Sequence, residues 1–203
     1  MSIIELKFPV KGTVIDSDHG YPLYAALSRL IPEVHRTEGI LISGISGVPD
    51  NQRKLHLQKN SKLRIRLPAE RISSFLKLAG KSVMLNHDKV SFGIPVTHLL
   101  KPYKNLYSRL VLIKVANEFT EESFFNSAKK QLENMGITAE PILFKNPQDG
   151  NFIRKTLSIK GKTLVGYPLT IVNLSPEESL LLQTKGLGGK QKMGCGTFVG
   201  IRG

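Results

Sequence analysis

The side chains best suited to proton transfer lie near the start of the chain. His35 follows Pro32 in the polar stretch IPEVHRTEG, and Arg36 stands beside it. A histidine titrates with a pKa of about 6.5, so it exchanges protons at neutral pH. Next to a bound ribose phosphate, such a group can take the proton of a 2′-hydroxyl or give one to a leaving 5′-oxygen. The plainer alternative is a solvated loop histidine with no chemical role.

Three other residues compete with His35 or could assist it. His19, in DSDHGY, is a rival base, because Asp18 next to it could orient the imidazole ring. Tyr21 and Tyr24 lie three residues apart in a predicted helix, so they should face the same way and could aid a proton relay. Core packing or helix capping would equally explain either tyrosine.

Other catalytic arrangements are missing from the sequence. The chain has one cysteine, Cys195, and its five histidines show no paired spacing typical of metal ligands. No Ser-His-acid arrangement and no pair of carboxylates stands out. We therefore expect no metal and no cofactor. The chemistry that remains is attack of a 2′-oxygen on phosphate, with histidine moving protons and lysine or backbone N–H groups stabilising the developing charge.

A glycine-rich stretch near the end of the chain, Gly186 to Gly200, has the sequence GLGGKQKMGCGTFVG. Its glycines leave the backbone open and its lysines add positive charge, which suits contact with a phosphate backbone. The candidate RNA contacts here are Lys185, Gly188, Gly189, Lys190, Lys192, Gly194 and Gly196. A P-loop and a Rossmann fingerprint are excluded, because Gln191 stands where the first needs Ser or Thr and the second needs glycine. A flexible surface turn is the alternative.

A basic segment lies between Asp50 and Glu70, where no acidic residue occurs. Alternation in the predicted strand 62–67 places Lys62, Arg64 and Arg66 on one face, and the basic groups recur about every 6.6 Å, close to phosphate spacing. Arg53 in this segment and Arg36 beside His35 complete the candidate RNA-binding set. A solvated strand face is the alternative.

The elements that must position these residues follow one order in the first half of the chain. We expect a strand from Ile4 to Phe8 and then a helix that opens near Pro22 and ends at Pro32. Strands over 40–45 and 62–67 come next. A helix with Ile72, Phe75, Leu76 and Ala79 on its apolar face then precedes strands over 82–86 and 89–94.

The second half repeats this order. We expect a strand over 106–116 and a helix capped by Thr120, with an apolar face formed by Phe125, Ala128, Leu132 and Met135. Strands over 141–145, 153–160 and 164–172 precede a helix with a Ser175–Glu178 capping box, and a strand over 197–201 closes the chain. Both halves are βαββαβ, apart from one extra strand in the second. We predict an α+β protein of two tandem ferredoxin-like (RRM-like) domains, residues 1–102 and 103–203.

Net charge restricts the class of partner. The chain carries 29 basic and 16 acidic residues, a net charge of +13, which favours nucleic acid ahead of an anionic membrane. No apolar run approaches the roughly 20 residues of a spanning helix, and MSIIELKF has no signal-peptide core, so we expect a cytoplasmic protein without a membrane partner. Strands 62–67 and 153–160 lack the aromatic pattern with which an RRM stacks single-stranded bases. Recognition of a hairpin stem by shape and backbone fits better.

The tandem βαββαβ order, His35 after the first helix and the closing GLGGKQKMGCGTF together resemble the CRISPR-associated repeat-cleaving endoribonuclease family, the sixth of the numbered Cas proteins. The resemblance covers the full length, and its most specific part is the loop ending in G-x-G-x-F, at Gly194, Gly196 and Phe198; DHGYPLYAALSRLIPEVH and ESLLLQTKGLGG add to it. It implies metal-independent cutting of precursor RNA within the repeat, near the base of a stem-loop. The implied products are 2′,3′-cyclic phosphate and 5′-hydroxyl ends on mature guide RNAs.

The same resemblance implies that His35 is the catalytic histidine. Tyr21, Tyr24 and Lys54 are its implied partners, although these positions vary among family members. Two alternatives stay open: a non-catalytic RNA-binding subunit of a CRISPR effector complex, whose other subunits would then be partners, and an enzyme whose base is His19. CRISPR repeat RNA with a stem-loop is the expected partner.

Overall fold

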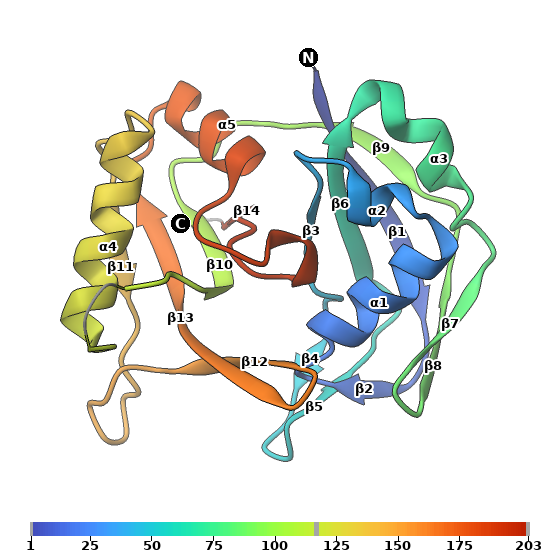
Figure 1. The fold of residues 1–203 in the computed structure, drawn as a ribbon, viewed down its shortest axis with the longest axis horizontal. Coiled ribbons are helices and arrows are strands. Elements are labelled where there is room, and N and C mark those ends of the chain that lie inside the picture. Colours follow the sequence, from blue (N-terminus) through green and yellow to red (C-terminus); the bar gives the residue numbers. More distant parts are fainter. Residues whose placement is uncertain (1, 116–117, 202–203) are drawn as a thin grey trace. The chain divides into compact units, whose positions relative to one another are not determined.

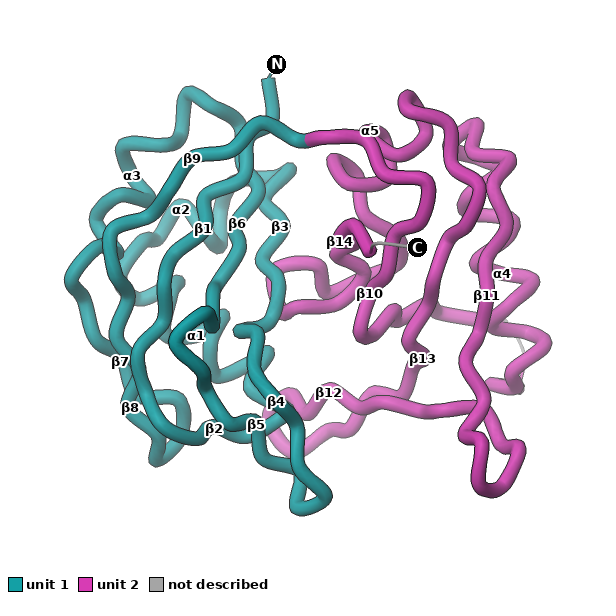
Figure 2. Tube along the Cα trace, turned by 180° about the vertical axis from the view of Figure 1, so that it is seen from behind, with its two compact units in different colours: residues 1–100 teal, residues 101–203 magenta. Residues whose placement is uncertain are grey.

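The computed structural model describes residues 2–115 and 118–201. The chain forms two compact units, Met1–Leu100 and Lys101–Gly203 (Figure 2). Within the described residues, no helix is both long enough and apolar enough to cross a lipid bilayer.

Unit 1 is built on an antiparallel sheet centred on β1 (Ile3–Lys11). On one side β1 pairs with β6 (Lys62–Pro68), which in turn pairs with β3 (Leu41–Ile42). On the other side β9 (Val96–Leu99) pairs with the first part of β1, and β8 (Asp88–Phe92) pairs with its last residues. β7 (Ser82–Leu85) forms a hairpin with β8. This strand order is the ferredoxin-like one.

The helices of unit 1 cover one face of this sheet (Figure 1). They are α1 (Gly20–Leu30), the short α2 (Glu33–Arg36), the 3₁₀ turn η1 (Ala69–Arg71) and α3 (Ile72–Leu76). Alternate residues of β1, Leu6 and Phe8 among them, are fully buried in one core with Leu27 of α1 and Phe75 of α3. Burial of such side chains is worth about 1.5–3 kcal/mol each, so this core fixes α1 and the residues that follow it.

A small second sheet in unit 1 has no counterpart among the predicted elements. It consists of β2 (Val14–Asp16), β5 (Lys54–His56) and β4 (Val48–Pro49), in the order β2-β5-β4. The predicted strand 40–45 is shorter in the structure, and β9 was not predicted.

Unit 2 repeats the topology. Its sheet has the order β11-β13-β10-β14, formed by β11 (Glu140–Leu143), β13 (Lys162–Val172), β10 (Leu106–Val111) and β14 (Val199–Gly200). β12 (Lys155–Ile159) pairs with the first half of β13 as a long hairpin. The predicted strand over 106–116 ends at Val111 in β10, and its last predicted residue, Ala116, lies outside the described residues.

The two helices of unit 2 begin at capping boxes. Thr120 caps α4 (Glu121–Asn134) with Ser123 as its reciprocal partner, and Ser175 caps α5 (Pro176–Lys185) with Glu178. Both caps and the start of α5 were predicted. On α4 it is Phe124 that is buried, with Ala128 and Leu132, and not the predicted Phe125, which is half-buried. Each unit thus has the βαββαβ order, and the predicted class of two tandem ferredoxin-like domains is confirmed.

The segment 101–105, which opens unit 2, is hydrogen-bonded to α5 and to the residues just before it. The backbone N–H of Tyr103 donates to the hydroxyl of the buried Ser179 (2.9 Å), and the Gln183 amide donates to the carbonyl of Lys101 (2.8 Å). Leu174 N–H donates to the Lys104 carbonyl at 3.0 Å. The segment is therefore part of the packed unit.

Candidate active site

His35 lies on α2, one helical turn that follows directly from α1. Ile31, after the end of α1, is 1% exposed, and Val34 of α2 is fully buried. These two side chains anchor the turn in the core, and Pro32 precedes the first residue of α2. His35 and Arg36 come next and are exposed. The histidine is therefore presented to solvent by a rigid turn and not by the loop that the sequence suggested.

The hydroxyl of Tyr24, on α1, lies 2.6 Å from Nδ1 of His35. The two rings are tilted by 47° with centroids 6.4 Å apart, so the contact is made edge-on through the polar atoms. When the Tyr24 hydroxyl donates to Nδ1, the ring proton is on Nε2, which can then give it away. When Nδ1 carries a proton and donates to the Tyr24 oxygen, a neutral ring is unprotonated at Nε2. The hydrogen bond with Tyr24 thus holds the ring through Nδ1 and is compatible with either state of Nε2.

Tyr21 does not join this pair. It lies three residues before Tyr24 on the same helix and is half-buried, and it forms no hydrogen bond or ring contact with any residue the structure describes. The two tyrosines were expected to act together, but only Tyr24 reaches His35.

Lys54 is held by a different group. Its Nζ donates to Oδ1 of Asp16 at 2.6 Å, and Asn86 donates to the other carboxylate oxygen at 3.2 Å. The hydrogen bond from Lys54 lowers the pKa of Asp16, and the same bond raises the pKa of Lys54. Asp16 precedes the start of α1, whereas His35 follows its end. Lys54 thus forms its ion pair with Asp16, at the opposite end of α1 from His35.

His19 is a structural residue, which corrects its prediction as a rival base. The side chain is 3% exposed. Its Nε2 accepts a hydrogen bond from the backbone N–H of Ile45 (2.9 Å), so the proton is on Nδ1, which donates to the Asp16 carbonyl at 2.8 Å. Both nitrogens of the neutral ring are therefore used in hydrogen bonds inside the protein. The ring links β2 to the loop after β3, and its lone pair is not available to take a proton from a substrate.

The basic strand β6 exposes less charge than its alternation predicts. Arg66 is 5% exposed and donates from Nε to Oε2 of Glu5 at 2.9 Å, a buried ion pair across β1 and β6. Its prediction as an RNA contact is therefore wrong. Arg64 is half-buried and only Lys62 is exposed. Glu5 could not be identified as the partner of Arg66 from the sequence, because it is 61 positions away in the chain although it lies directly opposite Arg66 in the sheet. Arg53, exposed in the turn before β5, remains a candidate.

The glycine-rich stretch 186–200, called the glycine loop below, is hydrogen-bonded to β10 and to the residue that follows it. Gly189 N–H donates to the Leu112 carbonyl (2.8 Å) and Gly196 N–H to the Leu110 carbonyl (2.7 Å). Gly188 N–H donates to the Gln131 side chain at 3.2 Å. The predicted cradle of free glycine N–H groups is therefore wrong for these three residues, because their donors are used inside the protein.

The glycines instead allow the loop to approach its neighbours. Gly188 has φ +73° and Gly196 has φ +60°, and a Cβ on either would collide with a backbone carbonyl, of Leu112 and Leu187 respectively. Gly194 and Gly196 are buried and Gly188 and Lys192 half-buried, while Lys185, Gly189 and Lys190 are exposed. Gly194 and Gly196 thus shape the loop, Lys190 presents positive charge on it, and Lys185 adds a charge beside it at the end of α5.

No set of three or more His, Cys, Asp or Glu side chains in the described ranges could hold a metal ion together. The candidate groups for proton transfer and for balancing charge on phosphate are the Tyr24–His35 pair and the exposed cations of the predicted set.

Comparisons with known proteins agree with one another. Residues 4–203 match the model of the family described as "Cas6 Crispr". The chain is 33% identical over 199 residues to the CRISPR-associated endonuclease Cas6 of Myxococcus xanthus (strain DK1622), covering 98% of this chain and 82% of that protein. Among solved structures it is similar to a CRISPR associated protein Cas6, with a TM-score of 0.66, 16% identity and 99% of each chain covered. It is also similar to Thermus thermophilus Cse3 bound to an RNA representing a pre-cleavage complex, with a TM-score of 0.51, 13% identity and 98% of each chain covered.

Proposed function

This chain belongs to the Cas6 CRISPR family, and from that premise we propose that it is an endoribonuclease that cuts CRISPR precursor RNA within each repeat. The curated relative is named a CRISPR-associated endonuclease, and a structural neighbour was solved with a pre-cleavage RNA. The observation that carries the proposal is the exposed His35 ring, held at Nδ1 by the Tyr24 hydroxyl.

The proposed reaction is an internal transesterification that needs no metal. The 2′-oxygen of the nucleotide before the cut bonds to phosphorus while the bond from phosphorus to the 5′-oxygen breaks. His35 transfers a proton through Nε2, either taking it from the 2′-hydroxyl or giving it to the leaving 5′-oxygen, and the other proton is exchanged with solvent. The products are a 2′,3′-cyclic phosphate and a 5′-hydroxyl, and no water molecule is added to either of them. Arg36, exposed on the same turn, is the nearest cation in sequence to balance the charge that develops on phosphate.

The RNA-binding part of the proposal rests on those predicted cations that the structure exposes. In unit 1 these are Lys62, Arg36 and Arg53, and in unit 2 they are Lys185 and Lys190. We expect the repeat stem-loop to be held mainly through its phosphates, because these groups are lysines and arginines on turns and strand ends.

The test is cleavage of a repeat stem-loop RNA in excess EDTA under single-turnover conditions. We expect a single cut, and we expect His35→Ala to lower its rate about 10²- to 10⁴-fold with RNA affinity nearly unchanged. His87→Ala is the matched control, since His87 is also an exposed histidine of unit 1. A substrate with 2′-deoxyribose at the cut should bind but stay intact.

Two outcomes would contradict the proposal. Cleavage that appears only with added Mg²⁺, or that continues on the deoxy substrate, would mean that the 2′-oxygen is not the nucleophile in a metal-free reaction. Tight RNA binding without any cleavage by the wild-type chain would favour the non-catalytic subunit instead.

A further inference from the structure

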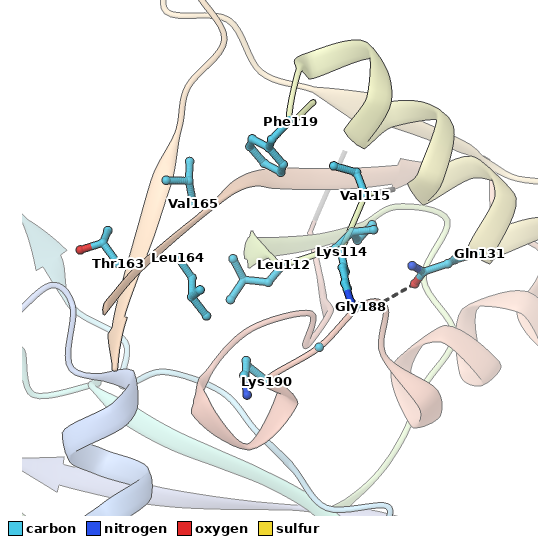
Figure 3. Close-up of a pocket in the computed structure, with 12 residues that line it drawn as sticks. Leu112, Lys114, Val115, Phe119, Gln131, Thr163, Leu164, Val165, Gly188 and Lys190 are labelled. Atoms are coloured by element: carbon cyan, nitrogen blue, oxygen red, sulfur yellow. Dashed lines mark hydrogen bonds between the residues drawn. The ribbon is translucent and has the colours of Figure 1, made fainter. Parts of the chain in front are cut away.

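Unit 2 contains an open groove of about 810 Å³ that the cleavage chemistry does not use. Its walls come from the end of β10, the β12–β13 hairpin, the segment leading into α4 and the glycine loop. Figure 3 shows Leu112, Leu164, Val165 and Phe119 arranged around the open centre, with Lys190 on the glycine loop beside it. The volume lies within the range of about 300–1,000 Å³ typical of small-ligand sites.

The aromatic wall of the groove is fixed before any ligand arrives. The Phe119 ring stacks on Tyr167, with centroids 5.7 Å apart and an interplanar angle of 16°, and packs edge-on against Phe124. Tyr167 and Phe124 are fully buried, whereas Phe119 is half-buried. A half-exposed ring held by two buried rings loses little freedom when a flat ligand packs against it.

Gln131 places hydrogen-bond donors at the groove. Its Oε1 accepts the Gly188 N–H, which identifies the oxygen end of the amide and leaves Nε2 on the other branch (Figure 3). Nε2 has no hydrogen-bond partner among the residues that the structure describes. Its two N–H groups are therefore available to an acceptor in the groove.

The charged residues of the lining are all cationic. Lys114 and Lys190 are exposed, and neither forms an ion pair or hydrogen bond through its ammonium group with another described residue. No carboxylate is among the lining residues. An apolar floor with amide donors and two lysines suits a flat, partly apolar ligand that carries a negative charge. An apolar peptide without acidic residues fits less well, because it would leave both lysines without a counter-charge.

We infer that this groove binds one unstacked nucleotide of the RNA, with its base against Phe119 and Leu164, an acceptor of the base on Gln131, and its phosphates near Lys114 and Lys190. The inference rests on the proposed function in assuming an RNA partner, but it does not require cleavage. Stacking of bases on aromatic side chains is how proteins hold single-stranded nucleotides. The groove would thus recognise an unpaired nucleotide that flanks the stem-loop, in addition to the stem itself.

The experiment measures equilibrium binding of the full chain to two RNAs, a repeat stem-loop with its single-stranded flanks and the same stem-loop without them. Gln131→Glu keeps the acceptor for Gly188 N–H but replaces the donors with a negative charge, so we expect about tenfold weaker binding of the flanked RNA. Asn126→Asp, an equal charge change on an exposed position of α4, should change binding less than about twofold. Neither variant should alter binding of the RNA without flanks.

A second pair of variants guards against misfolding of Gln131→Glu. Lys114→Ala should weaken binding of the flanked RNA more than Lys130→Ala, and both positions are exposed. Ultraviolet cross-linking of the flanked RNA to the wild-type chain should label the peptide that contains Phe119. Equal effects of each variant and its control, or cross-links confined to other peptides, would overturn the inference. If the flanked RNA binds through the groove but is never cut, the proposed function fails and the groove assignment stands; if the RNA is cut while these variants bind normally, the reverse holds.

Discussion

At the scale of single residues, Tyr24 decides how His35 can work. A histidine on an exposed one-turn helix can adopt several side-chain rotamers, but the Tyr24 hydroxyl lies 2.6 Å from Nδ1 and holds the His35 ring through that atom. This makes Tyr24 a positioning residue for the proposed proton transfer. The effect of removing it should then be on the rate of the chemical step and its dependence on pH, and not on RNA affinity.

We predict that Tyr24→Phe lowers the single-turnover cleavage rate about tenfold and changes the pH–rate profile, because the His35 ring loses the hydrogen bond that orients it for proton transfer. The measurement is the rate at saturating protein across the range in which histidine titrates. Tyr21→Phe is the control on the same helix and should have no effect on either quantity. Equal losses in both variants, with the pH–rate profile unchanged, would show that Tyr24 only supports the fold.

Residue types and local spacing were enough to select candidates for this site but not to place their partners. His35 and Tyr24 could be selected because a helix and the turn after it are close in sequence. The burial of His19 depends on the Ile45 N–H, and that of Arg66 on Glu5, and these contacts span 26 and 61 positions. Such contacts follow from strand register and from the packing of distant loops, which local patterns do not specify, so His19 was predicted as a rival base and Arg66 as an RNA contact.

At the scale of elements, the Glu178 side chain links the start of α5 to the segment that follows α4. The Glu178 carboxylate accepts hydrogen bonds from the Ser175 N–H at 2.9 Å and from the Thr138 N–H at 2.6 Å, and the second of these reaches the segment after α4. These bonds, from Ser175 first and Thr138 next, lower the pKa of Glu178 to about 2. The carboxylate thus stabilises the folded state at neutral pH.

We predict that Glu178→Gln lowers the free energy of unfolding by about 1 kcal/mol at neutral pH, as loss of a capping group does. A folded pKa below the unfolded value means that this contribution is complete above the unfolded pKa and disappears as pH falls toward the folded one. The difference between wild type and variant should therefore shrink between about pH 5 and pH 2. Urea unfolding monitored at several pH values measures it. Glu177→Gln, on the same helical turn, is the control, and a difference that stays constant with pH would contradict the assignment.

The elements themselves divide into those that local sequence predicts and those that it does not. The caps at Thr120 and Ser175 depend on residues three apart, so their patterns were sufficient. The sheet β2-β5-β4 is made of strands of two or three residues, too short for a period to be recognised. Phe124 and Phe125 are adjacent aromatic residues, and only the packing against Tyr167 decides which one is buried.

At the scale of the whole molecule, the net charge of +13 implies that RNA binding weakens with salt. Each phosphate contact with single-stranded RNA contributes about 0.7 to the slope of log affinity against log salt. We predict that Lys185→Ala combined with Lys190→Ala lowers this slope by about 1.4, since both side chains are exposed on or beside the glycine loop. Lys129→Ala with Lys130→Ala removes the same charge from exposed positions of α4 and is the control. An equal change of slope in the two double variants would place the contact outside the glycine loop.

The bonding of residues 101–105 into unit 2 determines where an isolated C-terminal fragment would have to begin. In a fragment that starts at Leu106, the Gln183 amide, on a side chain that is 2% exposed, would lose its hydrogen bond to the Lys101 carbonyl. The hydroxyl of the fully buried Ser179 would lose the hydrogen bond that it accepts from the Tyr103 N–H. Ser179 and Gln183 would keep the 3.2 Å hydrogen bond between them, but each lost hydrogen bond costs about 0.5–1.5 kcal/mol, a noticeable part of the stability of a domain of this size. Residues 101–105, whose polar sequence resembles a dispensable linker, are thus part of the fold of unit 2, and deleting them would destabilise that unit.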